Sequence, residues 1–527
     1  MVHHKWGNIS NITAAALRSR LLELGQTHFR LQLWSREKPV ALFQDVRAGR
    51  SGVCCLDTNL RRRYKGCAFL KDHEDMPKSL LSRRAFLQTT AVAAGAALAS
   101  NSIGLDAEPS YVTWEHSPAS DRVRFGIVGV GMEGSGVLAT AVALPGTECV
   151  AAADLYDGRH TLAREIVGKP IKTTRRYQEL LDDKSVDAIL IAVPDHWHRQ
   201  VVVDSLAAGK DVYCEKPMSH NPADGLAMVA AAKKTDRIVQ IGAQRTSSVL
   251  CAKVREMIGN GAIGDLNLIE ATLGRNDPTG AWEYPPPPDL SPENLDWDTW
   301  LGAAPKKPFD PYAFARWRCW KEYGTGVAGD LLVHLISGMQ FSLGINEVPK
   351  RVSAFGGIYR WKDGRNMPDV QAALFEYMGI PVYMRLSLGC ESAEVTRFQG
   401  SKGMIELREF SVTYSPQAGV DTSPSYYSGG FPGAMRAAYV KKWHEEHDPT
   451  PGKEPATESI TINGNDYDDL RPHLWKFFEA VRSRKPVVQD VVFGHNAALA
   501  CHLANESYFR GVPVRWDEAS QTIKSLA

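Results

Sequence analysis

Residues 123–136, VRFGIVGVGMEGSG, decide the fold of the larger part of this 527-residue chain. An apolar run ends at Val128, and Gly129, Gly131 and Gly134 follow it in the spacing G-x-G-x-x-G. A helix-like stretch comes next, and Asp154 ends the following apolar run. The glycine motif alone is a weak signal. Between a predicted strand and a predicted helix, it is typical of a dinucleotide-binding βαβ unit.

The glycines and Asp154 predict how a dinucleotide would be held. The first two glycines allow a tight turn and a close approach of the pyrophosphate, and the helix N-terminus supplies free N–H groups. Asp154 would accept hydrogen bonds from the adenosine ribose hydroxyls and would repel a 2′-phosphate. We therefore expect NAD as the cofactor. NADP stays open, because Arg159 lies close by in the sequence and could receive a phosphate.

Strand-like and helix-like segments alternate after the motif. The predicted strands are residues 149–153, 187–193, 211–214 and 238–241, with helical stretches between them. This alternation indicates βαβ units and a parallel sheet. We assign residues 121–242 to one doubly wound α/β domain of the Rossmann type, which would bind NAD(P).

The pattern changes after residue 243. Strand-like runs become longer and alternate more between apolar and polar residues, and the last long segment, 491–509, looks helical. This texture predicts an α+β domain with an open, mostly antiparallel sheet covered on one face. We assign residues 243–527 to this substrate-binding and catalytic domain. The predicted strands are residues 266–273, 351–359, 371–377, 382–388, 396–399 and 404–407.

Glu215-Lys216-Pro217 directly follows the predicted strand 211–214. In a doubly wound sheet the C-terminal ends of the strands face the ligand crevice. A lysine there could donate a hydrogen bond to a substrate hydroxyl or change the pKa of that hydroxyl. From residue type alone, an exposed loop lysine is the more common meaning.

Asp330 and His334 lie in the stretch GDLLVH, whose apolar spacing predicts a helix. Four residues apart on a helix, they would share one face and reach one another or one ligand. A carboxylate–imidazole pair suits proton transfer near neutral pH, with Asp330 orienting His334 and favouring its charged form. The alternative is an ordinary surface pair on the helix.

Together these motifs resemble the Gfo/Idh/MocA oxidoreductase family. The glycine motif, the Glu-Lys-Pro tripeptide and the G-D-x-x-x-H helix occur in that order over about residues 121–510, with a Pro194-x-x-x-His198 loop between them. The resemblance implies a Rossmann domain, followed by an open-sheet domain that closes over nicotinamide and substrate, and activity on sugars or cyclitols. It implies Lys216, Asp330 and His334 as the catalytic constellation. The implied cofactor-binding residues are Gly129, Gly131, Gly134, Asp154, Pro194, His198, Glu215, Lys216 and Pro217.

The chemistry that the resemblance implies is alcohol oxidation. His334, assisted by Asp330 and Lys216, would remove the proton of a ring hydroxyl while the carbon's hydride passes to nicotinamide C4. Lys216 as the base is an alternative that the sequence leaves open.

Other chemistry-bearing residues give weaker signals. We expect no metal site, because the histidines of His444-Glu-Glu-His447 are three positions apart, which departs from H-E-x-x-H. Gln244 and Arg245 follow the predicted strand 238–241 and could reach the substrate. Dense aromatic residues after residue 280 could stack on a sugar ring, although such residues more often form core. They are Trp282, Tyr284, Trp317, Trp320 and Tyr323.

Near residue 76 the sequence predicts an export signal. Arg83-Arg84 precedes a weakly apolar Ala/Gly/Thr run and an Ala-Leu-Ala pattern, which together resemble a twin-arginine signal peptide over residues 76–99. The run is too short and too rich in Thr for a membrane span. Residues 1–75 show no clear periodicity, and we interpret them as a doubtful extension, with translation starting at Met76. Residues 100–120 are predicted to be a linker.

Charge and compartment limit the partners. The chain has 44% hydrophobic and 23% charged residues, typical of a soluble globular protein, and residues 100–527 carry 45 Lys and Arg against 53 Asp and Glu. This mild acidity disfavours nucleic acid as a partner. We expect three partners: a carbohydrate substrate, the twin-arginine export machinery and a second copy of the chain. We expect the protein to be periplasmic or otherwise exported.

Export constrains the function, because no pool of free NAD is expected outside the cytoplasm. A secreted sugar oxidoreductase would then hold its cofactor tightly and recycle it within each turnover. An alternative is an NAD-dependent glycosidase or lyase, in which transient oxidation at C3 would acidify the C2–H and allow elimination. A nucleotide-bound sensor is a third, non-enzymatic interpretation, which the joint presence of Lys216, Asp330 and His334 disfavours.

Overall fold

The structure is a computed structural model that describes residues 29–34, 40–45, 50–55, 122–417, 424, 426–447, 457–461 and 468–526. The chain divides into two compact units, residues 1–108 and 109–527. In the first unit, β1 (Phe29–Trp34), β2 (Val40–Asp45) and β3 (Arg50–Cys55) form an antiparallel sheet in that order. The lack of visible periodicity over residues 1–75 gave no hint of these strands. The predicted signal peptide and the linker at 100–120 lie outside the described residues.

The second unit begins with a six-stranded parallel sheet in the order β6-β5-β4-β7-β8-β9. This order reverses between β4 and β7, the topological switch point where open α/β sheets bind ligands. The Rossmann-type fold predicted from the glycine motif is confirmed. The strands are β4 (Val123–Val128), β5 (Thr147–Ala153), β6 (Lys172–Thr174), β7 (Ala188–Ile191), β8 (Asp211–Cys214) and β9 (Val239–Ile241).

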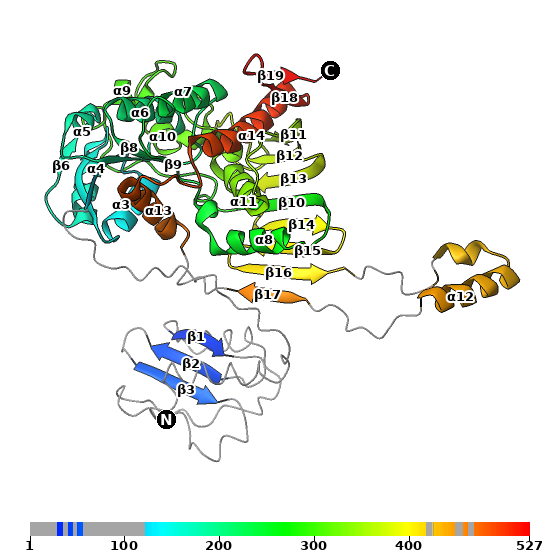
Figure 1. The fold of residues 1–527 in the computed structure, drawn as a ribbon. Coiled ribbons are helices and arrows are strands. Elements are labelled where there is room, and N and C mark those ends of the chain that lie inside the picture. Colours follow the sequence, from blue (N-terminus) through cyan, green and yellow to red (C-terminus); the bar gives the residue numbers. More distant parts are fainter. Residues whose placement is uncertain are drawn as a thin grey trace. The chain divides into compact units, whose positions relative to one another are not determined.

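Helices cover both faces of this sheet, so its strands are apolar on both sides. In β7, Ala188 and Leu190 pack with the helices on one face, whereas Ile189 and Ile191 pack with those on the other. Figure 1 shows α6 and α7 on one side and α3 and α13 on the opposite side. The helices are α3 (Met132–Val142), α4 (Asp157–Val167), α5 (Gln178–Asp182), α6 (Asp195–Ala207), α7 (Pro222–Ala232) and α13 (Leu470–Ser483).

A ten-stranded sheet follows, in the order β17-β16-β15-β14-β10-β13-β12-β11-β18-β19. Neighbouring strands are antiparallel except β10 and β13, which are parallel, so the predicted mostly antiparallel sheet is confirmed. The strands are β10 (Leu266–Gly274), β11 (Val352–Gly357), β12 (Val370–Tyr377), β13 (Ile380–Ser387), β14 (Ser392–Gly400), β15 (Gly403–Arg408), β16 (Ser411–Pro416), β17 (Glu458–Thr461), β18 (Val514–Asp517) and β19 (Thr522–Ser525).

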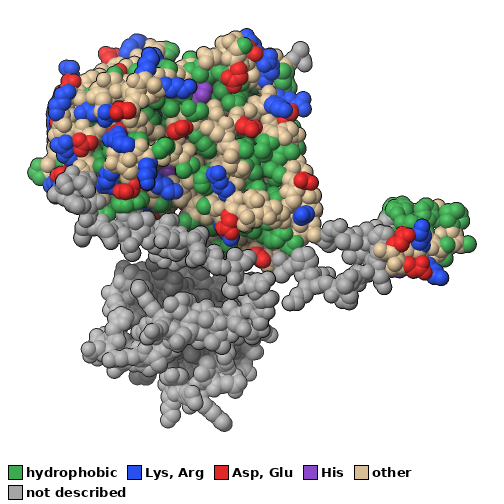
Figure 2. Space-filling model, viewed as in Figure 1, with side chains coloured by type: hydrophobic (Ala, Val, Ile, Leu, Met, Phe, Trp, Pro, Cys, Tyr) green, Lys and Arg blue, Asp and Glu red, His purple; other side chains and the backbone are tan. Residues whose placement is uncertain are grey.

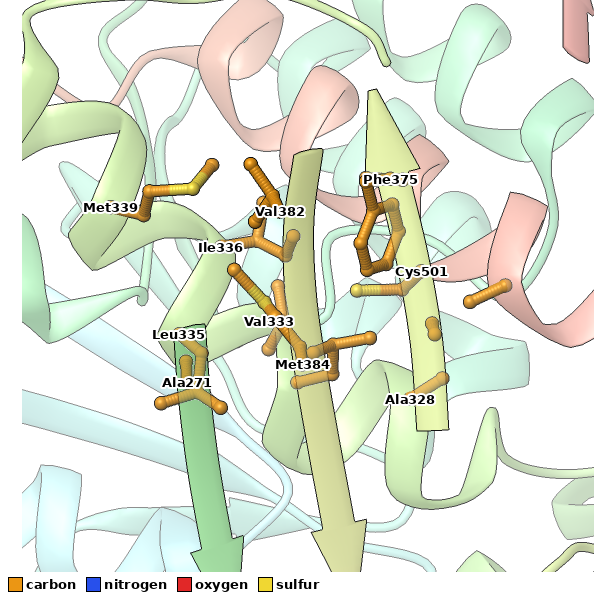
Figure 3. Packing of buried hydrophobic residues seen from close by; sticks show 14 of the residues in the cluster. Ala271, Ala328, Val333, Leu335, Ile336, Met339, Phe375, Val382, Met384 and Cys501 are labelled. Carbon is orange, nitrogen blue, oxygen red and sulfur yellow. The ribbon is translucent and has the colours of Figure 1, made fainter. Parts of the chain in front are cut away.

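One face of this sheet packs against α8 (Val249–Gly259), α11 (Val333–Leu343) and α14 (Val491–Arg510). In Figure 3, Val333 and Ile336 of α11 lie against Val382 and Met384 of β13, and Cys501 of α14 lies beside Phe375. Burial of these side chains holds α11 in one orientation on the sheet, at roughly 1.5–3 kcal/mol for each large apolar side chain. The predicted C-terminal helix matches α14.

The C-terminal segment also contributes to the core of the parallel sheet. Leu474, Phe477 and Phe478 of α13 are buried with Phe125 of β4, and the rings of Phe125 and Phe478 are 5.6 Å apart. The division at residues 242 and 243 stays a prediction. The hydrophobic core itself crosses it, because α13 lies more than 200 positions further along the chain.

Further short helices are α9 (Trp297–Leu301), α10 (Pro311–Ala315) and the 3-10 turns Gln244–Ser247, Trp317–Cys319 and Tyr426–Gly430, and α12 (Gly433–His447) is longer. No helix among the described residues is both long enough and apolar enough to span a bilayer. On the face shown in Figure 2, basic and acidic side chains are interspersed.

Candidate active site

A cavity of about 760 Å³ opens at the switch point of the parallel sheet. Its size is within the range of cofactor and ligand pockets. Gly129 and Gly131 after β4, Ala192 after β7 and Lys216 after β8 line it together, because the C-terminal ends of parallel strands meet at one edge. The Pro285–Pro288 loop and the Trp317–Arg318 turn, which follow the parallel-sheet domain in sequence, line it as well.

The glycine loop has the geometry that a pyrophosphate site requires. Gly129 has φ of +87°, and a Cβ there would lie 2.5 Å from the Ala192 carbonyl oxygen. A Cβ on Gly134 would lie 2.1 Å from the carbonyl oxygen of Gly129, so only glycine allows this turn. A Cβ on Gly131 would meet nothing within 4 Å. Gly131 caps α3 without a side-chain hydrogen bond, which leaves the first N–H groups of the helix available.

Asp154 lines the cavity at the end of β5, but its carboxylate already has partners. Oδ2 accepts from the Val130 backbone N–H at 2.8 Å, and Oδ1 accepts from the Tyr156 N–H at 3.0 Å. Burial raises the pKa of Asp154 despite these hydrogen bonds. Asp154 therefore holds the glycine loop in place through the Val130 N–H. The spacing of the sequence motif did not reveal this role. Each oxygen retains a lone pair for a ribose hydroxyl.

Lys216 lies in the cavity wall and pairs with Asp330. Its Nζ donates to Asp330 Oδ1 at 3.0 Å and to the Asp330 carbonyl oxygen at 2.9 Å. Arg318 Nε donates to the same Oδ1 at 3.1 Å. The two cations lower the pKa of Asp330 far below its usual range, although burial acts in the opposite direction. Asp330 in turn raises the pKa of Lys216 against the effect of burial, so Lys216 is an ammonium donor.

The segment that carries Asp330 is not the regular helix that the sequence predicted. Residues Ala328–Leu332 form a π-helical turn, which continues as α11 from Val333. Such turns interrupt the i→i−4 ladder and are frequent at functional sites. Asp330 lies in the π-turn and His334 in the α-helix. The side chain of Asp330 accepts its hydrogen bonds from Lys216 and Arg318.

His334 lies outside the wall of the large cavity. It borders a second cavity of about 20 Å³, together with Arg245 and Cys251. Burial lowers the pKa of His334 well below its usual value, and the charges of Lys216 and Arg245 lower it further. This differs from the expectation that Asp330 favours a charged His334: burial, together with the cations around the imidazole, outweighs that one carboxylate. A neutral imidazole is the form that can accept a proton.

Glu215 is buried in the cavity wall beside Lys216. Burial, with the nearby charge of Glu133, raises its pKa to about 8. Its Oε1 accepts from the Tyr213 hydroxyl at 2.9 Å, and its Oε2 accepts from the Lys216 N–H at 3.1 Å. Glu215 thus orients the loop that carries Lys216. The Lys216–Pro217 peptide bond is cis.

Pro194 lines the cavity, whereas His198 does not. His198 is buried, with Nδ1 2.8 Å from the Pro217 carbonyl oxygen and Nε2 2.9 Å from that of Val193. It therefore joins the loops after β7 and β8 and would act on a cofactor only through them. Of the residues between these positions, Asp195 lines the cavity, and so does Trp197. Its indole N–H donates to the Trp300 carbonyl oxygen at 2.9 Å.

The aromatic residues divide into two groups. Tyr284 and Trp317 line the cavity, whereas Trp282 is buried in the core. Trp320 and Tyr323 pack in an aromatic cluster with Trp300. Residue type could not separate these groups, because the separation depends on how the loop at 284–288 folds back over the cavity.

Arg245 does not line the large cavity. It forms ion pairs with Glu394 at 2.6 Å and Asp469 at 3.2 Å. Sequence reasoning also missed residues that do line the cavity, in particular Arg318, which lies between Trp317 and Cys319 and belongs to no chemical motif. Within the described part of the chain, no group of three or more His, Cys, Asp or Glu could hold a metal ion.

Comparison with protein families gives two matches. Residues 123–243 match the family model described as the oxidoreductase family, NAD-binding Rossmann fold, and residues 299–406 match the GFO/IDH/MocA C-terminal domain. Inositol 2-dehydrogenase of Salmonella typhimurium is 35% identical over 144 residues, which are 27% of this chain and 43% of the relative. Trans-1,2-dihydrobenzene-1,2-diol dehydrogenase of Mus musculus is 25% identical over 292 residues, 54% of this chain and 75% of the relative. The chain thus spans less than half the length of the inositol 2-dehydrogenases that it matches.

Solved structures show the same fold. Levoglucosan dehydrogenase in complex with NADH and levoglucosan superposes with a TM-score of 0.54 at 19% identity, over 75% of this chain and 99% of that one. Aldose-aldose oxidoreductase from Caulobacter crescentus, complexed with glycerol, gives 0.53 at 17% identity over the same shares. Over residues 123–243 and 299–406, the chain thus contains regions that match the NAD-binding and C-terminal domains of the GFO/IDH/MocA oxidoreductases.

Proposed function

We propose that the protein is a nicotinamide-dependent oxidoreductase that acts on a hydroxyl of a sugar or cyclitol. One observation carries this proposal: a single cavity joins the open glycine loop and Asp154 at one end to the Lys216–Asp330 pair at the other. Gly129, Gly131 and Asp154 would hold the dinucleotide, with Glu215 and Pro194 shaping the wall. The NADH-bound structural relative and the inositol 2-dehydrogenase sequences support the same class.

The residues have distinct parts in the proposed reaction. A bound nicotinamide ring would supply the hydride acceptor. Lys216, held as an ammonium by Asp330, donates a hydrogen bond to the substrate hydroxyl and stabilises negative charge on its oxygen. His334 is neutral but borders the second cavity and not this one, so it would accept the proton through an intermediary, Lys216 or a bound water, that reaches the hydroxyl. Lys216 as the base is the weaker assignment, because Asp330 favours its protonated form.

We further propose that the cofactor is tightly bound and recycled, and that the protein is exported through the twin-arginine route. The motive is the Arg83-Arg84 signal together with the glycine motif. Protein purified from its native compartment should contain close to one nicotinamide dinucleotide per chain, measured by mass spectrometry after denaturation. An empty site in freshly isolated, folded protein would count against recycling.

Single-turnover kinetics test the catalytic assignment. We expect His334→Ala to slow cofactor reduction, followed at 340 nm, by about 10²–10⁴-fold, the usual contribution of a general base. Cofactor content should stay near that of the wild type, because His334 does not contact the glycine loop. Lys216→Met should weaken substrate binding and slow reduction together, since its donor acts in both ground and transition states.

Two outcomes would change the assignment. A wild-type rate in His334→Ala would exclude His334 as the base and leave Lys216 as the candidate. Release of a chromogenic leaving group from glycosides without added NAD would show that oxidation serves elimination or hydrolysis and not net redox.

A further inference from the structure

Arg318 lies at the substrate end of the cavity with much of its hydrogen-bonding capacity unused. It lines the cavity beside Lys216 and Tyr284, and its side chain is 16% exposed. Its Nε donates to Asp330 Oδ1, which also accepts from Lys216. Among the described residues, no acceptor pairs with either Nη group of Arg318. Four N–H donors of a planar fork therefore remain for a ligand.

The guanidinium is held in place from two sides. Its central carbon lies 4.3 Å from the centre of the Trp317 ring, and its Nε is fixed by Asp330. The stacking on an aromatic face and the ion pair together restrict the rotation of the side chain. Arg318 thus presents its Nη edge as a preorganised donor, in a geometry that suits the two oxygens of a carboxylate or phosphate.

The cations at this edge outnumber the carboxylates that form ion pairs with them. One carboxylate, Asp330, faces the two cations Lys216 and Arg318. The pKa of Glu215, at about 8, leaves it mostly protonated at neutral pH, and His334 is neutral. The charge of Arg275 also acts to lower the pKa values of Tyr284 and His334. No carboxylate of the described residues forms an ion pair with Arg275.

Two further acidic residues act on these cations without forming ion pairs with them. Asp195 lines the cavity and its charge acts on Arg318, but its Oδ2 accepts hydrogen bonds from the Thr325 N–H at 3.0 Å and hydroxyl at 2.6 Å. Glu133 is exposed in the first turn of α3, and its charge raises the pKa values of Lys216 and Glu215. No carboxylate of the described residues forms an ion pair with the Nη edge of Arg318, and this unpaired edge in a partly desolvated wall favours an anionic ligand group.

We propose that Arg318 binds an oxyanion substituent of the substrate, a carboxylate or a phosphate, and that the substrate is an acidic sugar or cyclitol and not a neutral one. This inference rests on the proposed function and narrows its substrate class. Arg318 is then the residue that determines this specificity, while Lys216 contacts the hydroxyl to be oxidised.

Calorimetric titration of the purified, cofactor-loaded protein tests this inference. The ligands are glucose and galactose, each compared with its uronate and its 6-phosphate. We expect the oxyanion-bearing form of at least one sugar to bind about 10- to 100-fold more tightly than its parent, the range for hydrogen bonds to a charged group. The uronate and phosphate arms show which oxyanion is recognised.

Variants assign the preference to Arg318. Arg318→Gln should reduce it to less than about threefold, and Arg318→Lys should retain part of it, because charge remains while the fork is lost. Arg122→Gln, a surface arginine paired with Glu148, is the matched control and should keep the wild-type preference. If Arg318→Gln does not fold, judged by cofactor content and melting temperature, Arg318→Lys still tests the fork by a reduced preference.

The outcomes separate this inference from the proposed function. If no uronate or phosphate binds more tightly than its parent sugar, or if the preference survives in Arg318→Gln, the inference is overturned. Reduction of bound cofactor by neutral sugars alone would overturn it and leave the proposed function intact. Protein that contains no cofactor and reduces none with any sugar would overturn the proposed function, whatever the calorimetry shows.

Discussion

Replacement of Gly131 by Ala separates the folding of the glycine loop from its binding of a dinucleotide. Gly131 has φ of −70°, which any residue adopts, and a Cβ there would meet no protein atom within 4 Å. The added methyl group points into the open space next to the first N–H groups of α3. We therefore expect the variant to fold normally and to bind the cofactor poorly.

The expected size of both effects follows from this geometry. Ala is a poorer N-cap than Gly, so the free energy of unfolding should fall by about 1 kcal/mol or less. If the methyl group displaces the pyrophosphate from one or two backbone N–H donors, each lost charge-assisted hydrogen bond removes about 1.5–3 kcal/mol of binding free energy. That corresponds to an increase in Kd of at least about 10- to 100-fold.

The assay is calorimetric titration of cofactor-free protein with NAD, alongside denaturant unfolding. Gly136→Ala is the matched control, because Gly136 lies in the same helix, also has no atom within 4 Å of a Cβ, and does not line the cavity. It should bind NAD like the wild type and gain about 0.5–1 kcal/mol of stability. Wild-type affinity in Gly131→Ala would refute the assignment of this loop to the pyrophosphate.

Three further predictions concern the cofactor wall and the export signal. Asp154→Ala should weaken binding of both NAD and NADP and narrow the difference between the two affinities. The reason is that the contact with the glycine loop and the charge facing the ribose are both lost. Affinities equal to those of the wild type in titration would contradict this. Glu215, with a pKa raised to about 8, stabilises the fold when protonated, and this stability is lost as pH rises from about 4.5 through 8. Between pH 5 and 9, the free energy of unfolding of the wild type, measured with denaturant, should therefore fall by up to about 4 kcal/mol more than that of Glu215→Gln. Parallel pH profiles of the two proteins would show that Glu215 does not ionise in this range. Lysine at both Arg83 and Arg84 should retain the precursor in the cytoplasm, as cell fractionation would show; continued export would exclude the twin-arginine assignment.

Local sequence signals determined the parallel-sheet domain. The apolar run 123–128, the glycine spacing and the acidic end of the next strand are close in sequence and act through backbone conformation, so they predicted strand, turn and helix correctly. The helix that carries Asp330 and His334 was also correctly predicted as helical. The π-turn at Ala328–Leu332 was not, because side-chain spacing does not report which backbone hydrogen bond a turn makes.

Only the tertiary structure decided which residues surround the cavity. Asp330 meets Lys216 across 114 positions of sequence, and it faces Lys216 and Arg318 because α11 is packed against the ten-stranded sheet. The same packing places His334 beyond the cavity wall. His198, which shares a loop motif with Pro194, turns inward to join two strand-end loops. Arg318 has no motif at all; its role depends on the ring of the adjacent Trp317 and on the buried carboxylate of Asp330, which the fold brings to it. Contacts of this kind are long-range and depend on packing, whereas motifs record only what neighbouring residues in the chain can do.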